Sequence, residues 1–228
     1  MPTLARPLRI ATFNIRHGAP PDRSVRPFEL RRAVRGLGVE LLAMQEVDRR
    51  VGRSWFLDEA RWAARACGLV DTFAPARHLG PGGRYGVALL SATRPRAVEV
   101  IRLPSFGAEQ RVALMAAVDV GGVTISVAVA HLHHRSWIAL EQLDVVLGRL
   151  STRAGPHLLM GDLNVGRDQV GTAIADAGLT TVSVPPTFPT WAPAADIDWI
   201  AVGGLDVLEA TVVELWASDH FPMVATVQ

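Results

Sequence analysis

The sequence has no lysine, a single cysteine and no long apolar segment. All 23 basic residues are arginine. Cys67 is the only cysteine, so no disulfide can form within the chain. No apolar run approaches the roughly 20 residues that a membrane-spanning helix requires, and residues 1–10 lack the apolar stretch of a signal peptide. We therefore expect a cytoplasmic protein with no stable membrane association.

The composition that is present favours a globular protein. Hydrophobic residues make up 49% of the 228 residues, and the mean hydropathy is +0.22. A chain of this kind can bury a large core, which argues against disorder. No Ser/Gly-rich linker, charge run or internal repeat divides the sequence. We predict a single domain over residues 1–228.

Charge is unevenly distributed along the chain. Residues 1–111 contain 19 arginines and 10 acidic residues, whereas residues 112–228 contain 4 arginines and 12 acidic residues. We favour solvated surface and a compositional bias as the explanation. The functional alternative is an acidic half that binds a metal and an arginine-bearing half that meets an anionic substrate. The pI of about 8.1 does not by itself indicate nucleic-acid binding.

Periodicity and turn signals predict an α/β fold. Gly121-Gly122 is a hairpin signal, and Ser136 is a candidate N-cap for the helix that follows it. The expected helices span residues 27–37, 58–67, 137–150 and 168–177. The expected strands span residues 10–15, 41–46, 85–90, 98–103, 112–120, 123–131, 158–161, 197–202, 207–215 and 221–227.

Polar side chains gather at the ends of these strands. In the strand at 123–131, His131 shares a face with four buried aliphatic residues by period two. If the strands that begin near residues 198 and 221 run antiparallel to the others, all the polar ends meet on one rim, in one mixed sheet or two packed sheets. The rim would then carry Asn14, Glu46, His131 and Asp162 from carboxyl ends, and Asp198, Asp219 and His220 from amino ends.

This set of residues suits the hydrolysis of a phosphate ester. Carboxylate and amide oxygens without thiolates favour Mg²⁺ or Mn²⁺ over a structural zinc. Two histidines near carboxylates can supply an acid or base and its oriented partner. The sequence has no Gly-rich phosphate loop and no nucleophile elbow, so we expect water to be the nucleophile.

The same residues resemble the endonuclease/exonuclease/phosphatase superfamily, which includes deoxyribonuclease, abasic-site endonucleases, sphingomyelinases and inositol-phosphate phosphatases. Each matching piece is weak alone, but together they occur in family order over almost the whole chain. The pieces are Ala11–Arg16, Met44–Asp48, Tyr85–Ser91, Ala130–Leu132, Gly161–Asn164, Ile197–Ile200 and Ser218–Pro222.

The resemblance implies a four-layer α/β sandwich, with two packed mixed β-sheets flanked by helices. It also implies that Glu46 is the main metal ligand, with Asn14 and Asp219 beside it. His131 would contact the phosphate or the leaving group, and Asp162 and Asn164 would position water and phosphate. Asp198 and His220 match a carboxylate–histidine pair that serves as general base, although the resemblance leaves open whether Asp162 or His220 takes the proton.

The sequence departs from the family pattern at two positions. Asp196 stands where relatives often have Arg, and Ala130 where they often have Thr. Both changes bear on the choice of substrate.

Several neighbouring residues also have a structural interpretation. We expect His17, His133 and His134 to be loop residues, and we expect Trp191 to pack its loop down rather than stack on a ligand. Glu109 and Arg111 form either a pair behind the metal site or a cross-strand ion pair.

We predict a metal-dependent phosphoesterase that hydrolyses a phosphodiester or phosphomonoester by in-line attack of activated water. A nuclease is one form of this prediction. The first alternative is a small-molecule or phospholipid-headgroup phosphatase or phosphodiesterase, since the chain is close to a minimal version of the fold and its second half is acidic. The alternative of another class is a non-catalytic binding domain that keeps the fold.

Overall fold

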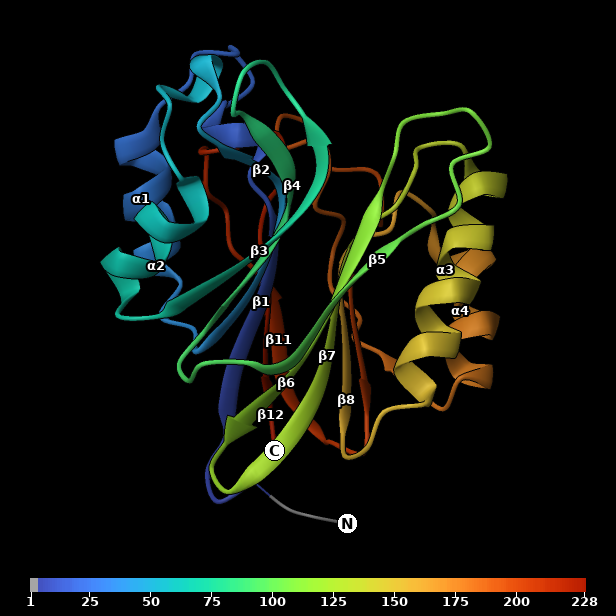
Figure 1. Cartoon of the computed structure of the whole chain (residues 1–228). Coiled ribbons are helices and arrows are strands. Elements are labelled where there is room, and N and C mark those ends of the chain that lie inside the picture. The colour runs from blue at the N-terminus through green and yellow to red at the C-terminus, as the bar shows by residue number, and fades with distance from the viewer. Residues whose placement is uncertain (1–3) are drawn as a thin grey trace.

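A computed structural model describes residues 4–228 and contains two six-stranded mixed sheets (Figure 1). The first sheet has the spatial order β11 (Val207–Val212), β12 (Met223–Val227), β1 (Leu8–Asn14), β2 (Leu41–Arg49), β4 (Arg84–Ser91) and β3 (Val70–His78). The second has the order β5 (Arg96–Arg102), β6 (Val112–Val120), β7 (Val123–His131), β8 (His157–Asp162), β10 (Asp198–Gly203) and β9 (Thr180–Thr181).

Helices cover the outer face of each sheet, so the protein has four layers. Helices α1 (Pro27–Gly36) and α2 (Glu59–Cys67) pack on the first sheet, and α3 (Ser136–Ser151) and α4 (Arg167–Asp176) pack on the second. Two short 3-10 turns, η1 (Arg16–Gly18) and η2 (Gly52–Ser54), follow β1 and β2. The predicted four-layer α/β sandwich is confirmed.

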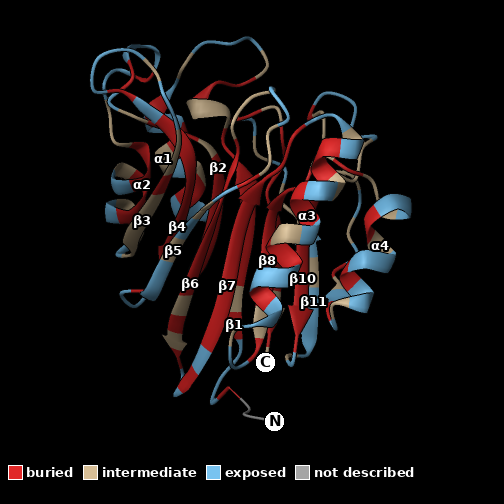
Figure 2. Ribbon diagram, turned by 45° about the vertical axis from the view of Figure 1, so that its right-hand side comes forward, coloured by how far each residue is buried: buried red, intermediate tan, exposed pale blue. Residues whose placement is uncertain are grey.

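Strand alternation divides the hydrophobic residues among three cores. In β7, Val127 and Val129 face the first sheet, whereas Ala128 and Ala130 face α3 and α4. Each inward residue gains burial from the opposite sheet and each outward residue from a helix, so both faces of most strands are apolar. Figure 2 shows this burial along the central strands, whereas loops, outer helix faces and the edge strands β5 and β11 carry the exposed residues.

The strand directions bring the polar ends together as predicted. β1 pairs in parallel with β2, and β7 with β8. β12 runs antiparallel to β1, and β10 runs antiparallel to β8. The carboxyl ends of β1, β2, β7 and β8 and the amino ends of β10 and β12 therefore lie at one end of the sandwich. We call this end the site end. The start of β1 and the C-terminus lie at the other end (Figure 1).

The structure differs from the sequence prediction in several details, among them the short strand β9, which was not predicted. The strand β3 was not predicted; it contains Pro75 but is an edge strand, where a missing N–H is tolerated, and a register irregularity lies between Pro75 and Arg77. The predicted N-cap at Ser136 is wrong, since α3 begins at Ser136 itself and its N-cap residue, Arg135, makes no side-chain cap hydrogen bond.

Among residues 4–228, no helix combines the length and the apolar character needed to cross a membrane.

Candidate active site

Three polar side chains form one row across the second sheet. His131 is paired with Asp162 in the parallel β7–β8 register, and Asp162 is paired with Asp198 in the antiparallel β8–β10 register. Period-two alternation places all three on the face that looks toward the first sheet, where Val129, Met160 and Ile200 fill the preceding row. All three polar side chains are buried. The site is therefore an extension of the inter-sheet core by polar groups.

Gly161 permits the close approach of β7 and β8 beside this row. A Cβ at position 161 would lie 2.0 Å from the carbonyl oxygen of Ala130 and 3.1 Å from its nitrogen. Because both atoms belong to backbone in the sheet interior, no side-chain movement can relieve the collision. Glycine at this position thus fixes the spacing that puts Asp162 beside His131.

Glu46 enters the site through a bulge in β2. Met44 and Val47 both pack on the outer face of the first sheet, and the register with β4 shifts between them. Glu46 lies at this irregularity with φ of 56°. Strict alternation would turn Glu46 away from the second sheet, so the bulge re-aims the side chain. Burial raises the pKa of Glu46, and an Asn14 hydrogen bond opposes the rise.

Asn14 joins the two sheets. Its Nδ2 donates to Glu46 Oε1 at 3.2 Å within the first sheet and to Asp162 Oδ2 at 2.9 Å on the second. Its Oδ1 accepts from the backbone N–H of Arg16 at 3.1 Å. Ser218 Oγ donates to the Asn14 carbonyl at 2.7 Å and so ties the segment of Asp219 and His220 to the same point.

His220 forms a buried pair with Asp198. His220 Nδ1 lies 2.8 Å from Asp198 Oδ2, which also accepts a hydrogen bond from Thr187 Oγ1 at 2.5 Å. Burial alone lowers the pKa of His220, but the charge and hydrogen bond of Asp198 and the charge of Asp162 outweigh it and raise the pKa to about 10. The ring of Phe188 covers His220 at a centroid distance of 4.5 Å. At neutral pH and without metal, His220 is a cation that can donate from Nε2.

His131 has a partner of the opposite charge, Arg111, for which the sequence left open a place behind the metal site or a cross-strand ion pair. Arg111 Nη1 lies 2.7 Å from His131 Nδ1. A guanidinium only donates, so Nδ1 accepts and the proton of the neutral ring sits on Nε2. Burial, followed by the charge of Arg111, lowers the pKa of His131 well below its usual value. His131 is thus a neutral donor whose Nε2 lies 3.5 Å from Asp162 Oδ2.

Asp162 lies between the two histidines. Burial and the charge of Asp198 raise the pKa of Asp162 to about 7. Its Oδ1 accepts from the backbone N–H of Asn164 at 3.0 Å, and its Oδ2 lies 3.9 Å from His220 Nε2. A carboxyl group with this pKa can release or accept a proton near neutral pH.

The remaining predicted residues lie beside this centre. Asn164 has φ of 53° and donates from Nδ2 to the carbonyl of Leu132 at 3.0 Å. Asp219 is half-buried, and its Oδ2 lies 3.3 Å from Arg16 Nη1. The structure therefore brings all eight predicted site residues to the site end, on both sheets.

The donor set fits a hard divalent cation. Glu46 and Asp219 offer carboxylate oxygens, and the raised pKa of buried Glu46 is the behaviour of a carboxylate that lacks a nearby cation. The amide of Asn14 turns its NH₂ toward the carboxylates, so ligation by its oxygen would require the amide to rotate. A second grouping, Asp162, Asp198 and His220, brings one potential ligand atom from each residue within 4.8 Å of the others and could also hold a metal ion.

The structure places the neighbouring residues that had more than one interpretation. Arg77 and Arg111 both lie near Glu109, at 2.8 and 3.7 Å, so Glu109 takes part in ion pairs while Arg111 reaches the site. His133 lies in a loop as predicted but is buried, and its Nδ1 accepts from the backbone N–H of Arg135 at 3.0 Å. Trp191 is 59% exposed, so the prediction that it packs its loop down is wrong.

The structure shows the surroundings of Asp196 and Ala130, the two departures from the family pattern. Asp196 lies 3.9 Å from Arg167, so its negative charge faces an arginine of α4. Ala130 is buried on the helix-covered face of β7, opposite to His131.

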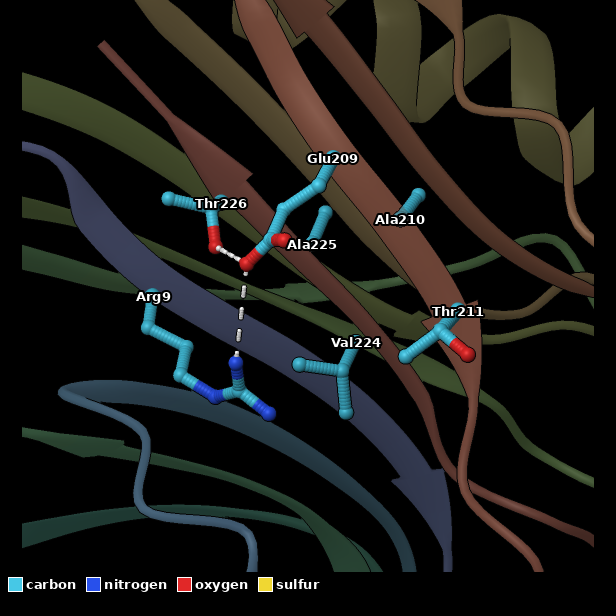
Figure 3. A pocket seen from close by; sticks show the side chains of 7 residues that line it. All are labelled: Arg9, Glu209, Ala210, Thr211, Val224, Ala225 and Thr226. Atoms are coloured by element: carbon cyan, nitrogen blue, oxygen red, sulfur yellow. Dashed lines mark hydrogen bonds and ion pairs between the residues drawn. The ribbon is translucent and has the colours of Figure 1, made fainter.

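A shallow hollow of about 110 Å³ lies elsewhere, on the outer face of the first sheet (Figure 3). Arg9 Nη1 lies 3.8 Å from Glu209 Oε1 there, and Thr226 Oγ1 donates to the same oxygen at 2.8 Å. Each polar group in this hollow is already paired, and none of the predicted site residues lines it. The hollow is therefore not the candidate active site.

Comparison with known proteins identifies the family and agrees with the fold. A model of the Endonuclease/Exonuclease/phosphatase family matches residues 11–220. The chain belongs to this family. Members of this family are phosphoesterase hydrolases that typically use divalent metals. Over 92 residues the chain is also 33% identical to a UPF0294 protein of Yersinia pseudotuberculosis, a match that covers 39% of this chain and spans only 35% of that relative.

Solved structures of the family share the fold across nearly the whole chain. An endonuclease/exonuclease/phosphatase from Beutenbergia cavernae is 23% identical with a TM-score of 0.82, covering 98% of this chain and 72% of that one. A mannosyl-6-phosphatase from Bacteroides thetaiotaomicron is 17% identical with a TM-score of 0.79, covering 97% and 99%. At these identities the likeness establishes the fold.

Proposed function

We propose that the protein is a metal-dependent phosphoesterase that cleaves a phosphate ester by in-line attack of water. The observation that carries the proposal is the double hydrogen bond of Asn14, which joins Glu46 on one sheet to Asp162 on the other. These bonds join the carboxylate side of the site, on the first sheet, to the side on the second sheet where His131 and His220 lie. The two histidines are in different protonation states. Hydrolysis of a phosphate ester needs both, a cation against the phosphoryl oxygens and groups that move a proton.

In this proposal, Glu46 and Asp219 hold a divalent cation, with Asn14 beside them. Once bound, the cation would neutralise charge on the phosphoryl group. His131 donates from Nε2 to a phosphoryl or leaving oxygen, and Arg111 keeps that proton on Nε2. Asn164 has a second amide hydrogen available for a phosphoryl oxygen after its bond to Leu132.

The proton of the attacking water goes to Asp162 or to His220. A group with a pKa of about 7 can accept a proton at neutral pH, whereas one with a pKa of about 10 already holds it. These pKa values favour Asp162 as the acceptor, with His220 as a charged donor to the transition state. A divalent cation nearby lowers both pKa values, because it attracts the carboxylate of Asp162 and repels the protonated ring of His220. Both residues therefore stay candidates for the base in the metal-loaded protein.

The test is hydrolysis of a soluble phosphodiester and its monoester analogue, with chelator and then with Mg²⁺ or Mn²⁺ restored. We expect chelator to abolish turnover, and Glu46→Ala to lower it by roughly 10³-fold or more. The matched control is Glu209→Ala, a carboxylate on the outer face of the first sheet. Near-normal turnover by Glu46→Ala, or full activity in chelator, would overturn the proposal.

Substrate class is the second part of the screen. The mannosyl-6-phosphatase with the same fold favours a small phosphoester, whereas the family also includes nucleases by its name. Binding to nucleic acid should weaken steeply as salt rises, and turnover of a small ester should change little. If no substrate is cleaved, a metal titration followed by thermal unfolding distinguishes a metal-binding site from a binding domain that retains only the fold.

A further inference from the structure

The exposed aromatic residues of the protein all lie at the site end. Seven aromatic side chains are more than half exposed among residues 4–228. Each stands on a loop or helix start that follows or precedes a strand at its site end. They are Phe28, Trp55, Phe56, Phe106, Trp137, Trp191 and Trp216. We call this set the aromatic rim.

The other end of the sandwich is different. Its connections include the β6–β7 hairpin at Gly121 and Gly122 and the segments at residues 92–95, 152–156 and 204–206, and none of them carries an exposed aromatic residue. The large exposed residues outside the rim are aliphatic and lie on the edge strands β5 and β11. General surface hydrophobicity would place aromatic residues at both ends, so their restriction to one end indicates a contact surface.

In two segments of the rim, exposed aromatic residues have positive φ angles. Trp55 and Phe56 follow η2 with φ of 58° and 57°, and Phe106 sits in the β5–β6 loop with φ of 48°. Bulky residues rarely adopt this left-handed conformation, and functional sites are where it persists. The two segments come from different sheets, so they flank the site from both sides.

The loops of the rim are tied to the site residues. The β5–β6 loop leads directly into Arg111, which contacts His131. Trp137 follows the same histidine by six residues and packs against Phe106 at a centroid distance of 5.1 Å. Phe188, whose ring covers His220, lies 6.5 Å from Trp191. A surface that contacts the rim is therefore presented to the site.

Positive charge accompanies the aromatic rings. Arg50, Arg84 and Arg135 are exposed at the site end, and none has an ion-pair partner within the described part of the chain. Arginine and tryptophan together suit a boundary between water and apolar chains, where phosphates lie beside the first methylenes. They also suit a single nucleic-acid strand.

Ring geometry favours the first of these. The rings pack on one another edge to face or tilted, with interplanar angles of 68° for Phe28 and Trp55 and 51° for Phe106 and Trp137. A strand that stacks its bases needs ring faces open in a line. The aromatic residues of the rim instead stand on separate loops and helix starts from both sheets, an arrangement that suits several separate contacts with a broad surface.

We propose that the aromatic rim docks reversibly on a phospholipid bilayer and that the substrate is a phosphoester carried in a lipid headgroup. This rests on the proposed phosphoesterase function and names its substrate class. Docking needs no membrane-spanning segment, because aromatic side chains enter only the headgroup region.

The experiment is flotation of the full chain with vesicles, in chelator so that no lipid is consumed. One vesicle preparation contains phosphatidylcholine alone, and the other contains phosphatidylcholine with phosphatidylglycerol. The variants are Phe106→Ser/Trp137→Ser and Trp55→Ser/Phe56→Ser. The matched control is Leu208→Ser on edge strand β11, where the leucine is 53% exposed but outside the rim. Thermal unfolding confirms that each variant is folded.

We expect the wild-type protein and Leu208→Ser to float with the vesicles, more strongly with the anionic lipid. Each rim variant should bind about tenfold more weakly, since two aromatic side chains leave the interface. The proposal is overturned if the wild type does not float, or if Leu208→Ser reduces binding as much as the rim variants do. It is also overturned if the rim variants weaken binding of a single-stranded oligonucleotide and leave vesicle binding unchanged.

Membrane docking and phosphoesterase activity are tested by separate measurements. Flotation measures binding without hydrolysis, whereas metal-dependent cleavage of a soluble diester measures hydrolysis without a bilayer. A protein that cleaves the soluble ester but ignores vesicles retains the phosphoesterase function and loses the lipid substrate. With metal restored, the lipid proposal further predicts that the rim variants lower the ratio of vesicle turnover to soluble turnover.

Discussion

His131 and His220 are equally buried in the site, but the residues that contact their Nδ1 atoms have opposite charges. Both are buried and both approach Asp162 Oδ2 with Nε2, at 3.5 Å for His131 and 3.9 Å for His220. Behind His131 stands Arg111, whereas behind His220 stands Asp198. The pKa of His131 is lowered and that of His220 is raised. Burial is common to both, so the charge of the residue behind each ring decides its protonation state.

This difference gives one site two kinds of donor. His131 offers a neutral N–H and His220 a charged one, on either side of a carboxyl group that titrates near neutral pH. Two groups with pKa values pushed apart are the usual sign of divided acid and base roles. Three predictions test whether the partner residues create this division.

The largest effect is expected for Asp198→Asn. The change keeps the shape of the side chain but removes the charge that raises the pKa of His220, so turnover should fall on the order of 10³-fold. Steady-state kinetics in saturating metal provides the measurement. The control is Thr187→Val, which removes the other hydrogen bond to Asp198 and should cost about tenfold or less. Equal losses in the two variants would show that orientation of Asp198, and not its charge, is what matters.

A smaller effect is expected in the stability of the metal-free protein. The raised pKa of His220 contributes stability that is complete below about pH 6.5 and is lost as pH rises toward about 10. The lowered pKa of His131 works the other way, since its contribution is present above about pH 6.5 and is lost as pH falls. Each group can change the free energy of unfolding by up to about 1.4 kcal/mol per pH unit within its window.

Denaturant unfolding across pH, with His220→Asn and His131→Asn as variants, measures both contributions. Relative to wild type, His220→Asn should flatten the alkaline side and His131→Asn the acid side. Comparing each variant with wild type cancels the titration of carboxylates elsewhere. If both variants flatten the same side, the two histidines do not differ in the way described.

The smallest effect is expected for Arg111→Met. It removes the donor to His131 Nδ1 while filling similar volume, so the ring can place its proton on either nitrogen. Turnover should fall about 10- to 100-fold, and nitrogen chemical shifts of the His131 ring should move from a single Nε2–H tautomer to a mixture. The control is Arg77→Met, which loses an ion pair with Glu109 but does not contact His131. An unchanged tautomer in Arg111→Met would contradict the assignment.

The strand ends and faces could be predicted because they depend on local pattern. The alternation in residues 123–131 placed His131 on the inner face, and the structure gives β7 the same bounds. The rim of polar residues followed from strand directions, which two packed mixed sheets provide. These features need only period two and the position of turns.

What could not be predicted depends on contacts between distant segments. Glu46 faces the site only because of a bulge, and no residue in Met44–Asp48 signals an extra residue in the pairing with β4. The sequence left Arg111 between a pair behind the metal site and a cross-strand ion pair, because its contact with His131 requires the β6–β7 pairing. Trp191 was expected to pack its loop down, but it is 59% exposed and meets Phe188 of that loop edge to face. In each case the missing information was tertiary.

The bond between Asn14 and Asp162 has a consequence for residues far from the chemistry. Its two ends belong to different sheets, and what separates those sheets is a layer of aliphatic side chains such as Leu114, Val127 and Met160. The thickness of that layer therefore determines how far the carboxylate side of the site stands from the side of the two histidines. A substitution that thins the layer by one methylene would alter turnover while the protein is still folded. Evolution can thus adjust the reaction of this enzyme family from inside the hydrophobic core.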